Sequence, residues 1–248
     1  MSDAYRGFAS VYDALMYDVD YPGLVEYINT LVPLEGPKVL DLGCGTGSVM
    51  TLLSQRGCDV FGMDLSSEMV EMALKKCPEA TAVVGDMSKQ ESYKQLPNNG
   101  EFDLVISMLD CMNYISSKDL LKSTFENVYR TLKSGGHILF DMNTEYKLST
   151  VLGDNFYYDL GDDECYLWEN EYDPDRRVCR FDLTFFAREE DGRYLRIDEV
   201  HREYAYSKEE IEELLRLAGF ENVKVYGNRK LEEPESCEER NFYMATKP

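Results

Sequence analysis

Three glycines separated by single residues follow a short apolar run near the start of the chain. The run Val39–Leu42 precedes Gly43, Gly45 and Gly47. A glycine turn between a strand and a helix lets a ligand approach the backbone without meeting a Cβ atom. The third glycine of a dinucleotide-binding turn would stand at position 48, which is Ser48, and no G-x-x-x-x-G-K-[ST] phosphate loop occurs. The turn therefore indicates another kind of small ligand.

Each of three short apolar segments that we predict to be strands contains or precedes an acidic residue near its end. These residues are Asp41 in the strand 38–42, Asp64 after the strand 60–63, and Asp86 after the strand 82–84. Taken singly, each carboxylate is better explained as a loop residue or a helix cap than as a ligand. Parallel strands, however, end at one edge of a sheet, where such folds bind their ligands. We therefore expect the three carboxylates to line one site.

The charges of this predicted site favour S-adenosylmethionine (SAM). A carboxylate at Asp41 would repel a pyrophosphate but would attract an ammonium group. SAM carries an ammonium, a sulfonium and a carboxylate, and it has no phosphate. Asp64 lies 23 residues after Asp41, at the place where an acid accepts both ribose hydroxyls. Asp86 would then accept the adenine amino proton, with Met87 against the ring.

Strands alternate with helices in the region that carries these residues. Helices are predicted over 48–56, from Ser66 or Ser67 to before Pro78, and over 117–133. Further strands are predicted at 102–107 and 138–140. This alternation indicates a parallel sheet covered on both faces, and right-handed crossovers make it a doubly wound, Rossmann-like α/β fold.

The chain on either side of this core has different patterns. Apolar residues from Tyr5 to Met16 recur at helical spacing, and a second helix runs from Pro22 to Pro33. Residues 156–206 alternate as half-buried antiparallel strands, and a helix at 208–217 precedes strands at 222–226 and 241–246. The predicted divisions are an N-terminal helical lid (1–36), a SAM-binding core (37–150), an antiparallel insertion over the site (151–206) and a C-terminal completion of the core (207–248).

The motifs together resemble the class I SAM-dependent methyltransferases over about residues 38–142. The residues that carry the resemblance are Asp41 to Gly47, Asp64, Gly85-Asp86-Met87, Phe102-Asp103-Leu104-Val105 and Leu132-Lys133-Ser134-Gly135-Gly136. The segment from Tyr5 to Asp13 and the insertion after the fifth strand are similar to a bacterial small-molecule subgroup that includes amino-sugar and glycine N-methyltransferases.

This resemblance implies a seven-stranded sheet whose last strand is antiparallel, with Asp41 near the methionine amino group, Asp64 on the ribose and Asp86 beside the adenine. The expected cofactor-binding residues are Asp41, Gly43, Cys44, Gly45, Gly47, Asp64, Leu65, Met69, Asp86, Met87 and Leu109.

The sequence says less about the methyl acceptor. The Asn/Asp-Pro-Pro-Tyr/Phe tetrad expected of enzymes that methylate base amines or glutamine amides is missing after the fourth strand, and no Pro-Cys pair of the C5-pyrimidine type occurs. Asp110, Asn113, Asn143 and Tyr204 are predicted to line an acceptor pocket, with a loop cap as the alternative for the first three.

The predicted catalytic residues are His201 and Tyr12. His201 lies in the insertion, where a neutral imidazole could take a proton from an amine acceptor; an ordinary surface histidine is the alternative. Tyr12 would reach the cofactor or the acceptor if the N-terminal helix covers the site. If that helix instead packs permanently on the core, Tyr12 has a structural role.

Composition limits the partners. The 248 residues include 47 Asp and Glu against 26 Lys and Arg, a net charge of −21, which disfavours nucleic acid as the main partner. The seven cysteines show no CxxC pair and the start of the chain lacks a secretion pattern, so we expect a cytoplasmic protein without metal or membrane segment, monomeric or homodimeric.

We therefore expect a methyltransferase acting on nitrogen or oxygen of a small molecule. The alternatives are an RNA or protein methyltransferase, an aminopropyl transferase that uses a decarboxylated relative of SAM, and a SAM-binding regulatory protein without turnover.

Overall fold

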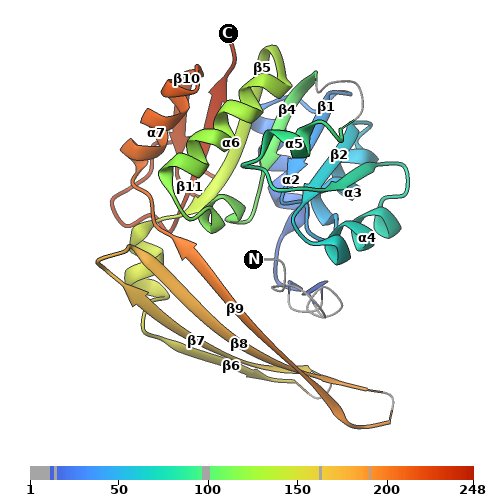
Figure 1. Cartoon of the computed structure of the whole chain (residues 1–248), viewed down its shortest axis with the longest axis vertical. Coiled ribbons are helices and arrows are strands. Elements are labelled where there is room, and N and C mark those ends of the chain that lie inside the picture. Colours follow the sequence, from blue (N-terminus) through green and yellow to red (C-terminus); the bar gives the residue numbers. More distant parts are fainter. Residues whose placement is uncertain (1–11, 14–15, 97–100, 162–163, 190) are drawn as a thin grey trace.

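The structure, a computed structural model, describes residues 12–13, 16–96, 101–161, 164–189 and 191–248. It contains two separate sheets, of seven and four strands (Figure 1). The strands of the larger sheet are β1 (Lys38–Leu42), β2 (Asp59–Asp64), β3 (Thr81–Val84), β4 (Phe102–Ser107), β5 (Leu132–Asn143), β10 (Glu221–Tyr226) and β11 (Arg240–Thr246). None of the helices in the described part of the chain combines the length and the apolar character of a membrane span.

The larger sheet is doubly wound, as predicted. Its strands lie in the order β10-β11-β5-β4-β1-β2-β3, and β11 alone runs antiparallel to its two neighbours. The helix α2 (Tyr21–Leu31) precedes β1. The crossover helices are α3 (Ser48–Gln55), α4 (Ser67–Lys76), α5 (Gln90–Tyr93), α6 (Lys118–Thr131) and α7 (Lys208–Leu217). The seven strands and the antiparallel last strand that the resemblance implied are therefore confirmed.

Helices cover both faces of this sheet, because its central strands are apolar on both sides. In β1, Leu40 belongs to the apolar cluster that includes residues of α5, α6 and α7, whereas its neighbour Val39 belongs to the cluster that includes residues of α2 and α3. Ser66 accepts a hydrogen bond from the Met69 amide at 3.2 Å and caps α4, one of the two capping residues expected. The carboxyl ends of the strands thus share one edge of a rigid layer.

Some boundaries differ from the sequence-based expectation. The strand expected at 138–140 begins six residues earlier, at Leu132, directly after α6 ends at Thr131. The reason is long-range pairing: the Gly135 amide donates to the Lys247 carbonyl oxygen (2.7 Å), and the Lys247 amide donates to Gly136 (2.9 Å). The helix expected from Tyr5 to Met16 lies mostly outside the described residues, of which 12 and 13 are helical.

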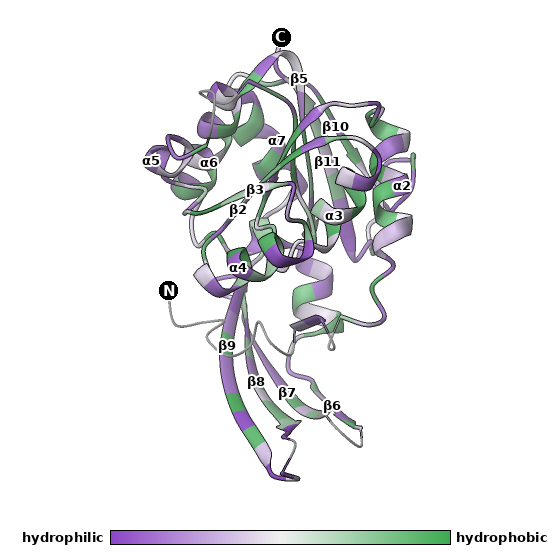
Figure 2. Ribbon diagram, turned by 90° about the vertical axis from the view of Figure 1, so that its right-hand side faces the viewer, coloured by the Kyte–Doolittle hydropathy of each residue, from purple (hydrophilic) through white to green (hydrophobic). Residues whose placement is uncertain are grey.

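The smaller sheet is the antiparallel insertion after the fifth strand. Its strands are β6 (Phe156–Leu160), β7 (Glu164–Asp173), β8 (Val178–Arg188) and β9 (Tyr194–Tyr204), paired in sequence order. Along β9, hydrophilic and hydrophobic residues alternate over much of its length (Figure 2). The strand β6 and the extension of β9 to Tyr204 were not individually predicted.

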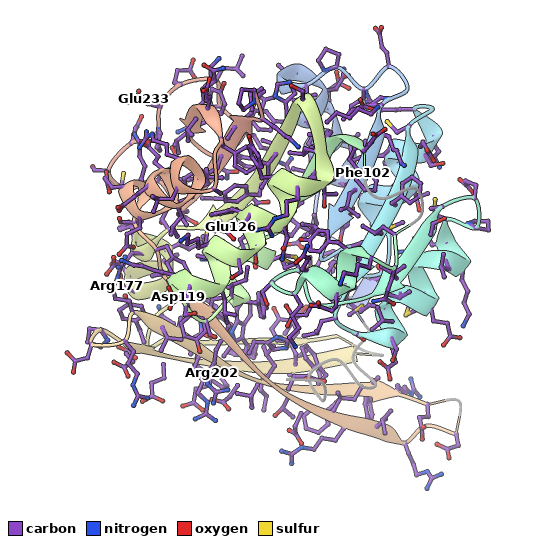
Figure 3. All side chains as sticks on the ribbon, turned by 45° about the horizontal axis from the view of Figure 1, so that its top comes forward. Phe102, Asp119, Glu126, Arg177, Arg202 and Glu233 are labelled. Carbon is purple, nitrogen blue, oxygen red and sulfur yellow. The ribbon has the colours of Figure 1, made fainter. Side chains whose placement is uncertain are left out.

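The insertion is anchored at both ends. At its base, Arg177 in the β7–β8 turn forms ion pairs with Glu210 of α7 and with Glu145, each at 3.0 Å (Figure 3). Toward its other end, Phe185 and Ile197 pack against Met69 of α4. The sheet therefore arches across the carboxyl edge of the larger sheet.

Candidate active site at the carboxyl edge of the sheet

A pocket opens at the carboxyl end of β1. It is bounded by the glycine turn, the start of α3, the loop after β4, Tyr21 of α2 and Tyr12. The lining residues are Tyr12, Tyr21, Asp41, Gly43, Cys44, Gly45, Thr46, Ser48, Val49, Met108, Leu109 and Cys111. Five of the eleven residues predicted to bind the cofactor are among them: Asp41, Gly43, Cys44, Gly45 and Leu109.

The glycine turn needs its glycines for two different reasons. Gly43, Gly45 and Gly47 all have positive φ angles, of 74°, 52° and 81°, which other residues rarely adopt. A Cβ atom on Gly43 would lie 2.6 Å from the Cys111 sulfur, so the backbone there packs closely against the next loop. A Cβ atom on Gly45 would meet nothing within 4 Å. The turn thus packs closely at Gly43 and leaves open space at Gly45.

Asp41 and Asp64 place buried negative charge beside this turn. Asp64 accepts hydrogen bonds from the Gly45 amide (2.8 Å) and the Ser66 amide (2.9 Å), and it thereby holds the turn against β2. Asp41 is only 2% exposed, and none of the described residues donates a hydrogen bond to its carboxyl group. Burial, and next the charge of Asp64, raise the pKa of Asp41 to about 7. A cation in the pocket would relieve this arrangement.

The residues predicted around the adenine lie farther along the same edge, outside the pocket lining. Asp86 accepts hydrogen bonds from the Ser88 amide (2.9 Å) and hydroxyl (2.7 Å). Burial acts to raise the pKa of Asp86, but these bonds and Lys89 outweigh it and lower the pKa. Met87 packs against the main core, Leu65 is exposed, and Met69 packs against the insertion.

The loop after β4 is held in an unusual conformation that the sequence analysis missed. Leu109 and Asp110 both have positive φ angles, of 60° and 56°. The buried Asp141 carboxylate at the end of β5 accepts hydrogen bonds from both amides, at 2.7 and 3.1 Å. Arg240 of β11 forms ion pairs with Asp141 and with Asp110. This network fixes the wall of the pocket that Leu109 and Cys111 form.

Asp141 was recognisable by the rule that found Asp41, since it follows an apolar run at the end of a predicted strand. Arg240 carries no local signal of this kind.

Two of the four predicted acceptor residues, Asn113 and Asn143, belong to one buried network. The Asn113 side chain accepts a hydrogen bond from the Asn143 amide (2.9 Å) and donates to the carbonyl oxygens of Asn143 (3.0 Å) and Tyr204 (3.1 Å). The Asn143 side chain donates to the Glu203 carboxylate at 2.7 Å. Asn113 therefore joins the ends of β5 and β9. The Glu203 side chain contacts this network through its hydrogen bond with Asn143.

The two predicted catalytic residues lie apart. His201 is buried on β9, with its ring edge-on to Tyr114 at a centroid distance of 5.8 Å. Burial lowers the pKa of His201 to about 4. Tyr12 lines the pocket and packs against the cluster formed by Met69, Phe185 and Ile197. The structure therefore places Tyr12 at the glycine turn and His201 on the buried face of the insertion.

A polar cluster joins the N-terminal segment to the glycine turn. Lys76 of α4 lies 2.7 Å from the Asp13 carboxylate and 3.0 Å from the hydroxyls of Thr46 and Ser48. Thr46 also donates to Asp13 at 2.6 Å. Asp13 therefore fixes its neighbour Tyr12 over the pocket, a contact absent from the sequence analysis.

Comparisons with known proteins agree with this geometry. The family model described as "Methyltransferase domain" matches residues 39–136. The putative methyltransferase YqeM of Bacillus subtilis is 34% identical over 244 residues, 98% of this chain and 97% of that protein. A SAM-dependent methyltransferase from Clostridium acetobutylicum has a similar structure, with a TM-score of 0.84, 33% identity and 98% coverage of both chains. The sugar N-methyltransferase KedS8 from a Streptoalloteichus species shares the fold, with a TM-score of 0.77, 20% identity and coverage of 96% and 92%.

The pocket suits the cofactor that these proteins indicate. The buried Asp41 carboxylate could pair with the ammonium group of SAM, and the space at Gly45 would admit a ligand close to the backbone. Because a relative that is more than 30% identical spans almost the whole chain, the similarity is not confined to the core. The chain belongs to the SAM-dependent methyltransferases, and SAM is the methyl donor of this enzyme.

Proposed function

We propose that this enzyme methylates a nitrogen or oxygen atom of a small molecule. The observation that carries the proposal is the cover over the pocket. The insertion closes over the carboxyl edge through the contact of Phe185 and Ile197 with Met69, and Tyr12 joins this contact from the N-terminal side. A site covered from two sides favours a small acceptor over a folded RNA or protein.

The acidic surroundings support an acceptor that is neutral or cationic. Asp41 lines the pocket with Asp64 behind it, Asp110 belongs to the loop after β4, and Asp141 and Glu203 lie near that loop. The net charge of −21 would disfavour a polyanion such as RNA. The fold shared with a sugar N-methyltransferase over 96% of the chain also supports a small nitrogen acceptor.

The proposed mechanism is an in-line displacement in which the protein chiefly positions the reactants. SAM supplies the methyl group as a sulfonium. We propose that Asp41 holds the ammonium group of the cofactor and Asp64 its ribose hydroxyls, with Asp86 beside the adenine. The wall at Leu109 and the cover at Tyr12 would hold the acceptor about 3–3.5 Å from the methyl carbon and exclude water.

The test uses matched acceptors and methyl-labelled SAM. Glycine and glucosamine are each compared with their hydroxyl counterparts, glycolate and glucose, and bulk tRNA and an unfolded protein serve as polymer acceptors. We expect label in a small molecule, and mass spectrometry identifies the atom. Transfer to tRNA or to protein in excess of every small acceptor would overturn the proposal.

A further inference from the structure

The inner face of β9 carries a row of ionisable residues. Glu199, His201 and Glu203 alternate along the strand, and each is only 5% exposed. Most of the inner face around them is apolar, with Phe181, Phe185 and Ile197 buried on it. Buried ionisable groups are unfavourable unless they are compensated, so a row of them beside an active site calls for a functional account.

Glu203 is the member of this row that the structure ties to the active site. Its carboxylate accepts the hydrogen bond from the Asn143 side chain at 2.7 Å, and Asn143 is itself held by Asn113. Asn113 belongs to the short helix η2 (Cys111–Tyr114), whose first residue, Cys111, lines the pocket. The short helix η2 therefore lines the cofactor pocket at Cys111 and, two residues later, holds Asn143, which in turn binds Glu203.

Charged and titratable groups lie around Glu203 on the elements packed against it. They are Asp110 before η2, Arg240 of β11, Lys147 of the short helix η3 (Lys147–Val151) and the Cys179 thiol across the strand pair in β8. Arg240 is already paired with Asp141 and Asp110. Burial, followed by the charge of Asp110, raises the pKa of Glu203 to about 8. Burial also lowers the pKa of Lys147.

We propose that Glu203 is the base that accepts a proton from the acceptor, and that the acceptor is therefore an amine that enters as its ammonium form. This inference rests on the proposed function and narrows its substrate class. One N–H bond of the ammonium group breaks, and the proton passes to the Glu203 carboxylate. The freed lone pair forms the N–C bond as the methyl–sulfur bond breaks, which leaves S-adenosylhomocysteine and an N-methylammonium product.

His201 is a weaker base for the same step. An alkylammonium group has a pKa of about 10, by analogy with lysine. Burial lowers the pKa of the His201 imidazole but raises the pKa of the Glu203 carboxyl group, so transfer of this proton to Glu203 is the less unfavourable of the two steps. On this account His201 packs against Tyr114, and Glu203 carries the proton.

The first experiment observes Glu203 without requiring the true acceptor. In glutamate-labelled protein bound to S-adenosylhomocysteine, the carbon-13 carboxyl signal that is missing from Glu203→Gln belongs to Glu203. We expect it to titrate near pH 8, and to titrate at lower pH in methylammonium chloride than in sodium chloride of equal concentration. A midpoint at the ordinary glutamate value, or the same midpoint in both salts, would overturn the inference.

The second experiment measures methyl transfer to glycine and glucosamine. Glu203→Gln keeps an oxygen for the Asn143 hydrogen bond, so we expect unchanged SAM affinity but a kcat/KM lowered by about 10²–10⁴ at neutral pH. The deficit should shrink at high pH, where the free amine is abundant. The matched control is Asp198→Asn, on the outer face of the same strand, where Asp198 pairs with Arg196 at 2.9 Å; its rate should equal that of wild type.

The outcomes separate the two proposals. A wild-type enzyme that methylates glycolate or glucose but neither amine would overturn the role of Glu203 and leave the proposed function standing. Equal rates for Glu203→Gln and wild type across the pH range would do the same. A wild-type enzyme that labels only tRNA or protein would overturn the proposed function itself.

Discussion

We propose that Asp41 links cofactor binding to protonation, because it is the residue expected at the ammonium group of SAM. It is buried beside Asp64 at the end of β1, and its pKa is raised to about 7 by that burial. A cation placed against it would favour the charged carboxylate and lower its pKa. Binding of SAM through its ammonium group must then be linked to the release of a proton.

We therefore expect SAM to bind more tightly as the pH rises from 6 to about 7, with little change above that. Calorimetry in buffers of different ionisation enthalpy should show fractional proton release near pH 6.5. Asp41→Asn should abolish this release and weaken SAM binding by about 1.5–3 kcal/mol, the scale of a charge-assisted hydrogen bond. Proton release that persists in Asp41→Asn would assign it to another group.

The strained loop at Leu109 and Asp110 depends on one buried ion pair. Asp141 is 1% exposed and satisfies both amides of that loop, while Arg240 balances its charge. Removing one partner of a buried pair leaves an uncompensated charge, which is far more unfavourable than the loss of a surface pair.

Arg240→Ala should therefore lower the free energy of unfolding by about 3–5 kcal/mol, measured by urea denaturation. The control is Arg216→Ala, which removes an i,i+4 pair with Glu212 on the surface of α7 and should change the value by less than about 1 kcal/mol. Equal effects of the two substitutions would show that the buried network does not stabilise the loop.

The N-terminal segment contacts both the antiparallel insertion and the glycine turn of the cofactor pocket. Its described residues Tyr12 and Asp13 reach opposite sides of the site: Tyr12 contacts the insertion cluster, and Asp13 contacts Lys76 and Thr46. Because Thr46 belongs to the glycine turn, cofactor bound there would stabilise the same contacts that hold the segment. These contacts are compatible with the predicted lid and with permanent packing on the core, the alternative that the sequence left open.

Hydrogen exchange over residues 3–18 should slow when SAM is added, and Asp13→Asn should speed exchange and reduce the effect of SAM. Glu71→Gln is the matched control. Glu71 pairs with Lys75 on the exposed side of α4, the helix that also carries Lys76, the partner of Asp13. Unchanged protection on addition of SAM to wild type would support permanent packing instead of a lid.

At the scale of the whole molecule, buried acids govern the pH dependence of stability. The folded pKa values of Glu203 and Asp41 lie above the ordinary values of unfolded carboxyl groups, so the folded state binds more protons as far up as pH 8. Stability must then fall as pH rises through that range. His201 acts in the opposite sense, since its lowered pKa destabilises the folded state below about pH 6.5.

Between pH 6.5 and 8 the acids should prevail, and the free energy of unfolding without SAM should fall by about 2 kcal/mol. Glu203→Gln should remove most of this slope in urea titrations, since the contribution of Asp41 ends near pH 7. A stability that rises with pH over this interval would show that these carboxyl groups do not dominate.

Local sequence determined the core fold and the glycine turn. Apolar runs, caps and glycines act over a few residues, so the sequence predicted β1, the turn at Gly43–Gly47 and a cap at Ser66 or Ser67, of which the structure has Ser66. The meeting of Asp41 and Asp64 was also predictable, because parallel strands that alternate with helices end at one edge. Local signals sufficed where neighbouring residues determine the geometry.

Tertiary structure alone decided which groups meet near the ends of β5 and β9. Arg240 is 99 residues from Asp141, and Glu203 is 60 residues from Asn143. Their contacts depend on the register of β11 against β5, which places Arg240 opposite Asn143, and on the arch of β9 over the sheet edge. Periodicity predicts that a strand alternates, but it specifies neither its register nor the face that becomes buried. The sequence therefore pointed to His201, and only the packed structure singled out Glu203.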